Sequence, residues 1–384
     1  MKKVFSLILA LAMVFAFTSC KNADTGEEED EAQKQAPYKI GIITGSAAQG
    51  EEYYGAENVK EKYGDIIVTA TYPDDYSIEI KKVTDTVSKM AEDPDVKVII
   101  FVQAVPGASA AIEQVRETRD DIIFICGATN EDPSTIASQA DVVLHVDEEG
   151  MGTAMVDQAA AMGAKTFVHI SFQRHLGYDD VTAQREQIIK RCEELNIEFV
   201  EAEAPDPTGS EGIEGAKQWI DENIPDYVEQ YGKDTAFFCT SCSMQSALIR
   251  RCAELGAIFP QQCCPSPYHG YPEAFSISLD GHEGDTEYLM GQIEEKAEDY
   301  GMTGRMSTWS VSPNMMMIEA AVKYAIGWCD GNFQADEGRT YNETALLEEI
   351  KNIGGEGTTV EKYEEEESGT LDNYYVILCP YRNF

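Results

Sequence analysis

The stretch "VIIFVQAVPGASAA", residues 98–111, decides the fold. Five apolar residues, Val98 to Val102, run without a break, which is typical of a strand buried on both faces of a parallel sheet. A Pro-Gly turn follows, and the alanine-rich residues from Gly107 onward predict the first turn of a helix. Gln103 stands between the strand and the turn, where it either shapes the turn or contacts a ligand.

Outward from this stretch, strand-like and helix-like segments alternate along most of the chain. Such alternation predicts βαβ units, and two series of them separate near residue 148. The expected fold is therefore α/β, with two Rossmann-like lobes whose parallel sheets are flanked by helices. Strands are expected at residues 38–44, 66–72, 96–102, 121–128 and 140–146, then at 165–172, 197–204, 234–241 and 274–279, with an edge strand at 374–380.

The N-terminal segment is expected to lie outside the folded body. Two lysines precede an apolar run, residues 4–17, that is too short for a comfortable membrane span. The run ends in "FTSC" (17–20), which resembles a bacterial lipobox and implies cleavage before Cys20 and lipidation of its thiol. The alternative is an ordinary signal peptide with an incidental cysteine. The acidic residues 27–31 mark the following segment as a solvated tether.

The charge excludes several classes of partner. The chain has 384 residues with 69 acidic and 29 basic side chains, a formal net charge of −40. Such a surface repels phosphate backbones and anionic lipids. We therefore expect no nucleic-acid partner and no peripheral amphipathic membrane helix.

The cysteine count is unusual for an exported protein. There are 10 cysteines, and if Cys20 carries lipid an odd number remains, which cannot all pair within one chain. Oxidising compartments normally favour paired cysteines. Our hypothesis is that the thiols stay reduced, as they would in an anaerobic host.

One pair of cysteine motifs raises the question of a metal. Cys239-x-x-Cys242 resembles half of a redox or metal site, which Cys263-Cys264 and His269 could complete. The alternative is that these cysteines pack as small hydrophobic side chains. We adopt that interpretation, so neither a metal nor another cofactor is expected.

Six short motifs carry a family resemblance, which covers about residues 38–331. They are "KIGIITG" (39–45) with "QG" (49–50), "VQAVPG" (102–107), "GAKTFVHISFQRH" (163–175), "APDPTG" (204–209), "GKDTAFFCT" (232–240) and "QCCPSPYHGYP" (262–272). The chain resembles a bacterial lipoprotein family of unknown function with a type I periplasmic-binding-protein-like fold, as in ABC-transporter solute-binding proteins. The resemblance implies two hinged lobes and no particular ligand.

The expected organisation follows from that resemblance and from the segment pattern. It comprises a lipoprotein signal peptide (1–19), an acidic tether (20–36), an N-terminal lobe (37–148), a C-terminal lobe (149–305), and a final part (306–384) with a return crossing, a helix packed back on the N-terminal lobe and a tail.

Candidate ligand-binding residues follow the predicted strands. Open parallel sheets bind ligands beyond the carboxyl ends of their strands, and in a two-lobed body these ends face each other across a cleft. The N-terminal lobe offers Ser46, Gln49, Tyr72, Gln103, Thr129 and Asp147, and the later part of the chain offers Ser171, Arg174, His175, Asp206, Thr240, Tyr268, His269 and Trp309.

Several of these residues have an alternative structural role. Ser46 and Thr129 could cap helices or shape turns, and Asp206 stands where aspartate commonly builds a turn. Arg174 could grip a ligand carboxylate or phosphate, or pair with Asp147 across the lobes. The aromatic side chains either stack on a sugar ring or nucleobase or seal the lobe.

These features predict a binding protein and not an enzyme. It would sit on the extracytoplasmic face of the cell membrane through its lipid anchor. It would capture a sugar, polyol or nucleoside-like ligand by hinge closure and present it to an ABC-type permease. Two alternatives stay open, a sensory ligand-binding lipoprotein and a thiol- or metal-dependent enzyme in the same cleft.

Overall fold

The computed structural model describes residues 38–365 and 369–384. The predicted signal peptide, the lipidation site Cys20 and the acidic tether lie outside the described residues, and so does the side chain of Gln49. Among the helices of the described part, none combines the length and the apolar character that crossing a membrane requires.

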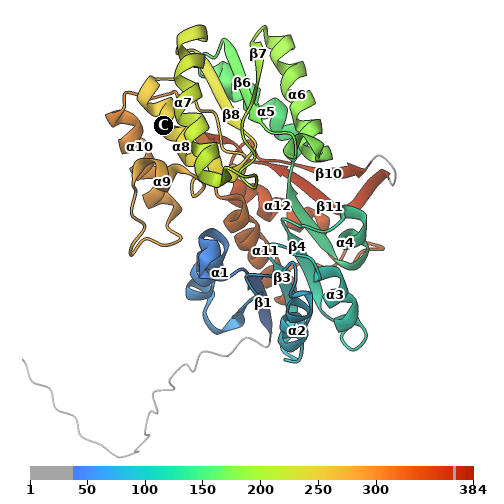
Figure 1. The fold of residues 1–384 in the computed structure, drawn as a ribbon. Helices are drawn as coiled ribbons and strands as arrows, with labels where there is room; N and C mark the ends of the chain where they lie inside the picture. Colours follow the sequence, from blue (N-terminus) through green and yellow to red (C-terminus); the bar gives the residue numbers. More distant parts are fainter. Residues whose placement is uncertain (1–37, 366–368) are drawn as a thin grey trace, which may run out of the picture. The chain divides into compact units, whose positions relative to one another are not determined.

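The first sheet has seven strands in the order β10-β11-β5-β4-β3-β1-β2 (Figure 1). Neighbouring strands from β2 to β11 run parallel, and β10 pairs antiparallel with β11. The C-terminal segment expected at the edge is therefore second from the edge, because β10 covers it. The bounds are β1 Lys39–Thr44, β2 Ile67–Thr71, β3 Val96–Phe101, β4 Ile123–Gly127, β5 Val142–Val146, β10 Thr359–Glu365 and β11 Gly369–Leu378.

Successive residues of β3 enter two different hydrophobic cores, one on each face of this sheet. Val98 and Ile100 join the core shared with α1, α11 and α12, whereas Ile99 and Phe101 join the core under α2, α3 and α4. The unbroken apolar run is thus confirmed as a strand buried on both faces. The helices are α1 Gly50–Tyr63, α2 Ile80–Ala91, α3 Ala108–Arg116, α4 Pro133–Gln139, α11 Pro313–Cys329 and α12 Glu343–Gly354, with the short 3₁₀ helices η1 Ala47–Gln49 and η2 Gly64–Ile66.

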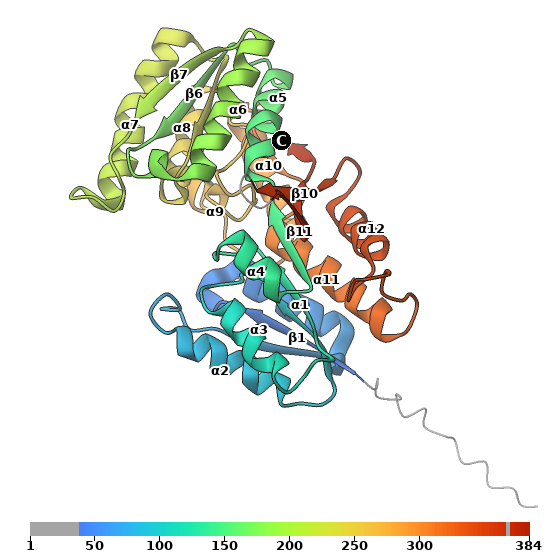
Figure 2. The ribbon, with the colours of Figure 1, turned by 90° about the vertical axis from the view of Figure 1, so that its right-hand side faces the viewer.

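The second sheet has three parallel strands in the order β7-β6-β8. Helices α5 and α6 cover one face and α7 and α8 the other (Figure 2). The bounds are β6 Thr166–Ser171, β7 Glu198–Glu203, β8 Thr235–Cys239, α5 Glu148–Ala161, α6 Asp179–Leu195, α7 Gly212–Tyr231, α8 Gln245–Leu255, α9 Tyr271–Phe275 and α10 Thr286–Asp299, with η3 His175–Gly177 and η4 Cys242–Met244. We call this sheet with α5–α10 the second lobe, and the seven-stranded sheet with its helices the first lobe.

The return crossing forms a small ladder of its own. Strand β9 (Ser307–Trp309) pairs antiparallel with β12 (Tyr381–Asn383). The predicted α/β class, with parallel sheets flanked by helices, is confirmed.

One predicted strand is wrong. Residues 274–279 begin inside the short helix α9, which ends at Phe275, and the rest of the segment forms no strand. Ser276 adopts a left-handed conformation with φ of 53° that ends the helix. A short apolar run fits a buried helix turn as well as a strand, and Ala274 and Phe275 are buried from the helix instead.

Candidate functional site

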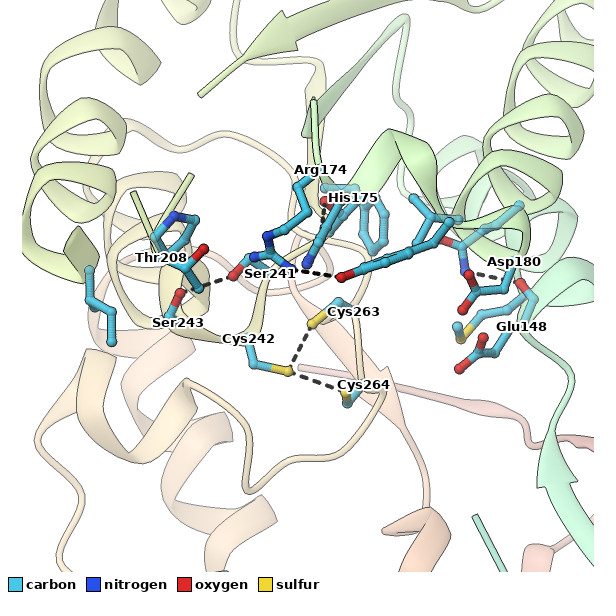
Figure 3. A pocket seen from close by; sticks show the side chains of 18 residues that line it. Glu148, Arg174, His175, Asp180, Thr208, Ser241, Cys242, Ser243, Cys263 and Cys264 are labelled. Atoms are coloured by element: carbon cyan, nitrogen blue, oxygen red, sulfur yellow. Dashed lines mark hydrogen bonds between the residues drawn. The ribbon is translucent and has the colours of Figure 1, made fainter. Parts of the chain in front are cut away.

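A cavity of about 520 Å³ opens where the three strands of the second sheet end (Figure 3). Its volume is in the range of small-molecule sites. The loops after all three strands contribute to it, because parallel strands end at the same edge of a sheet. The polar lining includes Arg174 and His175 after β6, Thr208 after β7, and Thr240, Ser241 and Ser243 after β8.

Hydroxyl groups and one imidazole form two hydrogen-bonded sets on this wall. Thr240 Oγ1 lies 2.9 Å from Ser171 Oγ and 3.0 Å from His175 Nδ1, and Ser241 Oγ lies 2.9 Å from Ser243 Oγ. Burial, and then the positive charge of Arg174, lower the pKa of His175. The imidazole is therefore neutral near pH 7, and these groups present donors and acceptors without a fixed charge.

The guanidinium of Arg174 is held by the protein itself. Its Nε and Nη2 donate to the two carboxylate oxygens of Asp206 at 2.8 and 3.0 Å, and Nη1 donates to the Tyr178 hydroxyl at 3.0 Å. The alternative pairing with Asp147 is wrong, since Asp147 caps α5 by accepting from Gly150 N at 2.8 Å. Asp206 thus serves to orient Arg174 at the cavity.

Two carboxyl groups meet at another part of the cavity. Glu148, the first residue of α5, and Asp180 of α6 both line it (Figure 3). Burial first, and then the hydrogen bond and charge of Asp180, raise the pKa of Glu148 to about 8. Near pH 7 Glu148 therefore keeps its proton and acts as a hydrogen-bond donor.

Three thiols gather on the same wall. Cys242 Sγ lies 3.2 Å from Cys263 Sγ and 3.3 Å from Cys264 Sγ, and all three sulfurs are within 4.8 Å of one another. Hydrogen bonds with Cys242 and Cys263, and the neighbouring His269, hold the pKa of Cys264 well below its usual value. Cys239 is buried at the end of β8 and packs as a small hydrophobic residue, but Cys242 and Cys264 are exposed and do not.

The two lobes meet at a buried carboxylate. Glu51 lies at the start of α1, beyond the carboxyl end of β1, and is only 8% exposed. It accepts hydrogen bonds from Ser266 Oγ at 2.9 Å and from the Ser312 hydroxyl, and His269 Nε2 lies 3.2 Å from it. Burial acts to raise the pKa of Glu51, but His269 and the two serines outweigh it and lower the pKa. A charged group of the first lobe thus holds the segment that carries the thiols.

The candidates Tyr72 and Gln103 form a polar chain inside the first lobe. The Tyr72 hydroxyl donates to Glu52 Oε1 at 2.7 Å and lies 3.2 Å from Gln103 Oε1. Because a hydroxyl has one proton, Gln103 receives at most a shared bond. Tyr72 is 2% exposed and so is unavailable to a ligand in this conformation, whereas Gln103 is half-buried.

The remaining candidates mostly shape the chain. Ser46 caps η1 by accepting from Ala48 N at 3.2 Å, and Thr129 Oγ1 accepts from Glu131 N at 3.1 Å. Half-buried Tyr268 lies 3.3 Å from the Thr286 hydroxyl. The expectation of a ligand contact by Trp309 is wrong, because its side chain is fully buried in β9.

Several groups at these sites were not among the sequence-based candidates. Glu148, Asp180 and Thr208 line the cavity and Glu51 joins the lobes. Glu51 does follow a predicted strand, which is a usable signal, but an acidic residue at a helix start also suits a solvent-exposed position. Nothing in the local sequence indicates that Glu148 faces Asp180.

Comparison with known proteins identifies the family to which the chain belongs. The model of the family described as "Protein of unknown function (DUF3798)" matches residues 38–307. An uncharacterized protein of Treponema pallidum (strain Nichols) is 30% identical over 221 residues, which cover 54% of this chain and 99% of the relative.

Two solved structures share the fold. A proposed transcriptional regulator from Clostridium difficile 630 has a TM-score of 0.80 at 21% identity, covering 90% of this chain and 99% of that one. A sugar ABC transporter structure from Actinomyces odontolyticus ATCC 17982 has a TM-score of 0.52 at 9% identity, covering 78% and 86%. At these identities the likeness shows the fold alone.

Proposed function

We propose that this chain, which belongs to the DUF3798 family of proteins of unknown function, is a solute-binding protein that binds a small neutral ligand in the cavity of its second lobe and encloses it by closure of the first lobe. The observation that carries the proposal is the cavity at the ends of β6, β7 and β8, with its wall of hydroxyl groups and a neutral imidazole. Such a wall suits a sugar, a polyol or the ribose of a nucleoside, which both donate and accept hydrogen bonds.

The charges around the cavity favour a neutral ligand over an anion. The guanidinium of Arg174 already bonds both oxygens of Asp206 and the Tyr178 hydroxyl, and Glu148 keeps its proton near pH 7. Asp206 already balances the charge of Arg174, so a ligand carboxylate beside Arg174 would also be repelled by the carboxylate of Asp206. The fold shared with a sugar ABC transporter structure agrees with this choice, as an analogy.

Capture would proceed by closure of the lobes. A ligand that bonds both lobes favours the closed form by its differential affinity for the two forms. Glu51, which follows β1 in the first lobe, already contacts Ser266 and His269 of the second lobe. Residues of this chain therefore supply a contact that holds the two lobes together. No covalent step is required.

The setting of this activity is part of the proposal. A lipid on Cys20 would hold the protein at the extracytoplasmic face of the cell membrane, and the resemblance of residues 17–20 to a lipobox supports that. The captured solute would pass to an ABC-type permease.

Native mass spectrometry of the protein purified from its host tests the proposal by detecting a retained ligand. Calorimetry with a panel of monosaccharides, polyols and nucleosides then gives affinities for the wild type and for Thr240→Val, which removes the hydroxyl shared by Ser171 and His175. We expect Thr240→Val to weaken binding at least tenfold, because the ligand loses one hydrogen bond to the protein. The matched control is Thr303→Val, at an exposed position of the second lobe outside the cavity lining. Equal affinity in both variants would contradict the proposed site.

A further inference from the structure

We propose that Cys242, Cys263 and Cys264 bind one thiophilic divalent metal ion of the Zn²⁺ class on the wall of the cavity. The three residues come from two loops that the fold brings together, η4 after β8 and the proline-rich segment after α8. This site goes beyond the proposed solute binding and does not depend on which solute is bound.

The distances between the sulfurs suit a shared ion. Zinc–sulfur bonds of about 2.3 Å in a tetrahedral site place the sulfurs about 3.8 Å apart. Here two of the three sulfur–sulfur distances are 3.2 and 3.3 Å, and no two of the sulfurs are more than 4.8 Å apart. The observed separations are therefore close to the separation of about 3.8 Å that a shared ion requires. Shifts of about half an ångström, within ordinary side-chain freedom, would complete the geometry.

The arrangement favours an ion over a disulfide. Cys242 faces Cys263 and Cys264 almost equally, at 3.2 and 3.3 Å, so neither is singled out as its partner (Figure 3). A disulfide between two of them would leave the third thiol unpaired beside it. A three-coordinate thiolate set uses all three sulfurs in the same way.

The exposure of the thiols indicates what kind of site this is. Cys242 and Cys264 are exposed, and all three cysteines line the cavity. Structural zinc sites are closed by four protein ligands, whereas sites with three protein ligands keep a fourth position open. The fourth position of an ion bound here faces the cavity, where water or a polar group of a small molecule can occupy it.

A second layer of polar residues backs the thiols. His269 lies beside Cys264, and its Nδ1 is buried without a hydrogen-bond partner among the described residues, while Nε2 lies 3.2 Å from Glu51. Metal ligands are commonly oriented by such outer partners, which are themselves held by carboxylates. The prolines at 265 and 267 also restrict the backbone that carries Cys263 and Cys264.

The chemistry of binding balances without an outside reagent. Three metal–sulfur bonds replace bonds from the ion to water, and each thiol that is still protonated releases its proton to solvent. No electron is transferred.

Cobalt titration of the reduced, metal-free full-length chain tests the proposal. We expect one equivalent of Co²⁺ to bind and to give a thiolate-to-cobalt charge-transfer band with the intense visible bands of a tetrahedral site, and Zn²⁺ to displace it. Cys242→Ser, Cys263→Ser and Cys264→Ser should each weaken binding at least tenfold. Cys329→Ser, at a partly buried thiol of α11 outside the cluster, should not.

Circular dichroism of each variant checks that the fold is retained. Cys242 and Cys264 are both exposed, so if one of their serine variants fails to fold, the other still tests the site. Absence of the charge-transfer band in the folded wild type would overturn the proposal. So would equal cobalt affinity in the cluster variants and Cys329→Ser, or a disulfide at Cys242 in protein purified without oxygen.

Discussion

Replacing Glu148 with glutamine tests the carboxyl pair at the cavity. The pKa of Glu148 is raised from 4.5 to about 8 by burial and by Asp180. The folded protein therefore keeps a proton that the unfolded chain releases, so Glu148 makes the folded state less stable as the pH rises from about 4.5 to about 8. At about 1.4 kcal/mol per pH unit the full effect is about 5 kcal/mol. Since the half-buried side chain faces an open cavity, we expect screening to leave about 2 kcal/mol.

Urea unfolding of the wild type and Glu148→Gln near pH 5 and near pH 9 measures this effect. The glutamine keeps the shape and a donor toward Asp180 but does not titrate. The variant should therefore gain about 2 kcal/mol over the wild type on going from the lower to the higher pH. Glu149→Gln, at the exposed neighbouring position of α5, is the matched control and should show no such gain. A wild-type-to-Glu148→Gln difference that stays the same at both pH values would refute the reasoning.

Three further predictions concern groups away from that pair. Gln103 belongs to the first lobe and does not line the cavity, so it would contact the solute through the proposed closure of the lobes, and on that basis Gln103→Ala should weaken solute binding at least tenfold in calorimetry. The substitution should change the unfolding free energy of the empty protein by less than about 1 kcal/mol, because its 3.2 Å bond is shared, and a loss of about 2 kcal/mol or more would make it structural. Glu51→Ala should lower stability by about 3 kcal/mol in urea unfolding, because it removes the acceptor of two buried serine hydroxyls and of the half-buried His269, and a loss below about 1 kcal/mol would contradict this. His169→Leu should remove a loss of stability that the wild type shows below pH 6.5. Burial lowers the pKa of this fully buried imidazole, so the unfolded chain takes up a proton more readily; equal acid sensitivity of both proteins would count against it.

Most of the fold could be predicted because its strands carry a strong local signal. In β3 both faces are buried from Val98 to Phe101, so these four successive positions are all apolar, and the Pro-Gly turn that follows marks where the strand ends. The failed strand at 274–279 shows the limit of the same signal. Ala274 and Phe275 are buried by a single helical turn, and Ser276 in the left-handed conformation ends that turn before Ile277.

Part of the candidate site could be predicted from topology alone. Arg174, His175 and Thr240 line the cavity because they follow parallel strands that end at one edge. The same rule cannot say which of these groups is free to bind a ligand. The bidentate bond between Arg174 and Asp206 joins two loops whose relative placement depends on the packing of β6 and β7. The burial of Trp309 is hard to predict for a similar reason, since it depends on pairing with the C-terminal strand β12, which is distant in sequence.

The thiol cluster shows why spacing along the chain can mislead. The Cys239-x-x-Cys242 motif suggests that its two sulfurs act together, but β8 ends at Cys239 and points that side chain into the core, while Cys242 lies in the turn beyond. The partners of Cys242 come instead from a loop 21 and 22 residues further on. Because no single motif contains the three sulfurs, replacing the C-x-x-C pair together would confound a core residue with a cavity residue. Each thiol of the cluster has to be removed separately, with Cys239 left in place, for a loss of metal binding to be assigned to the site.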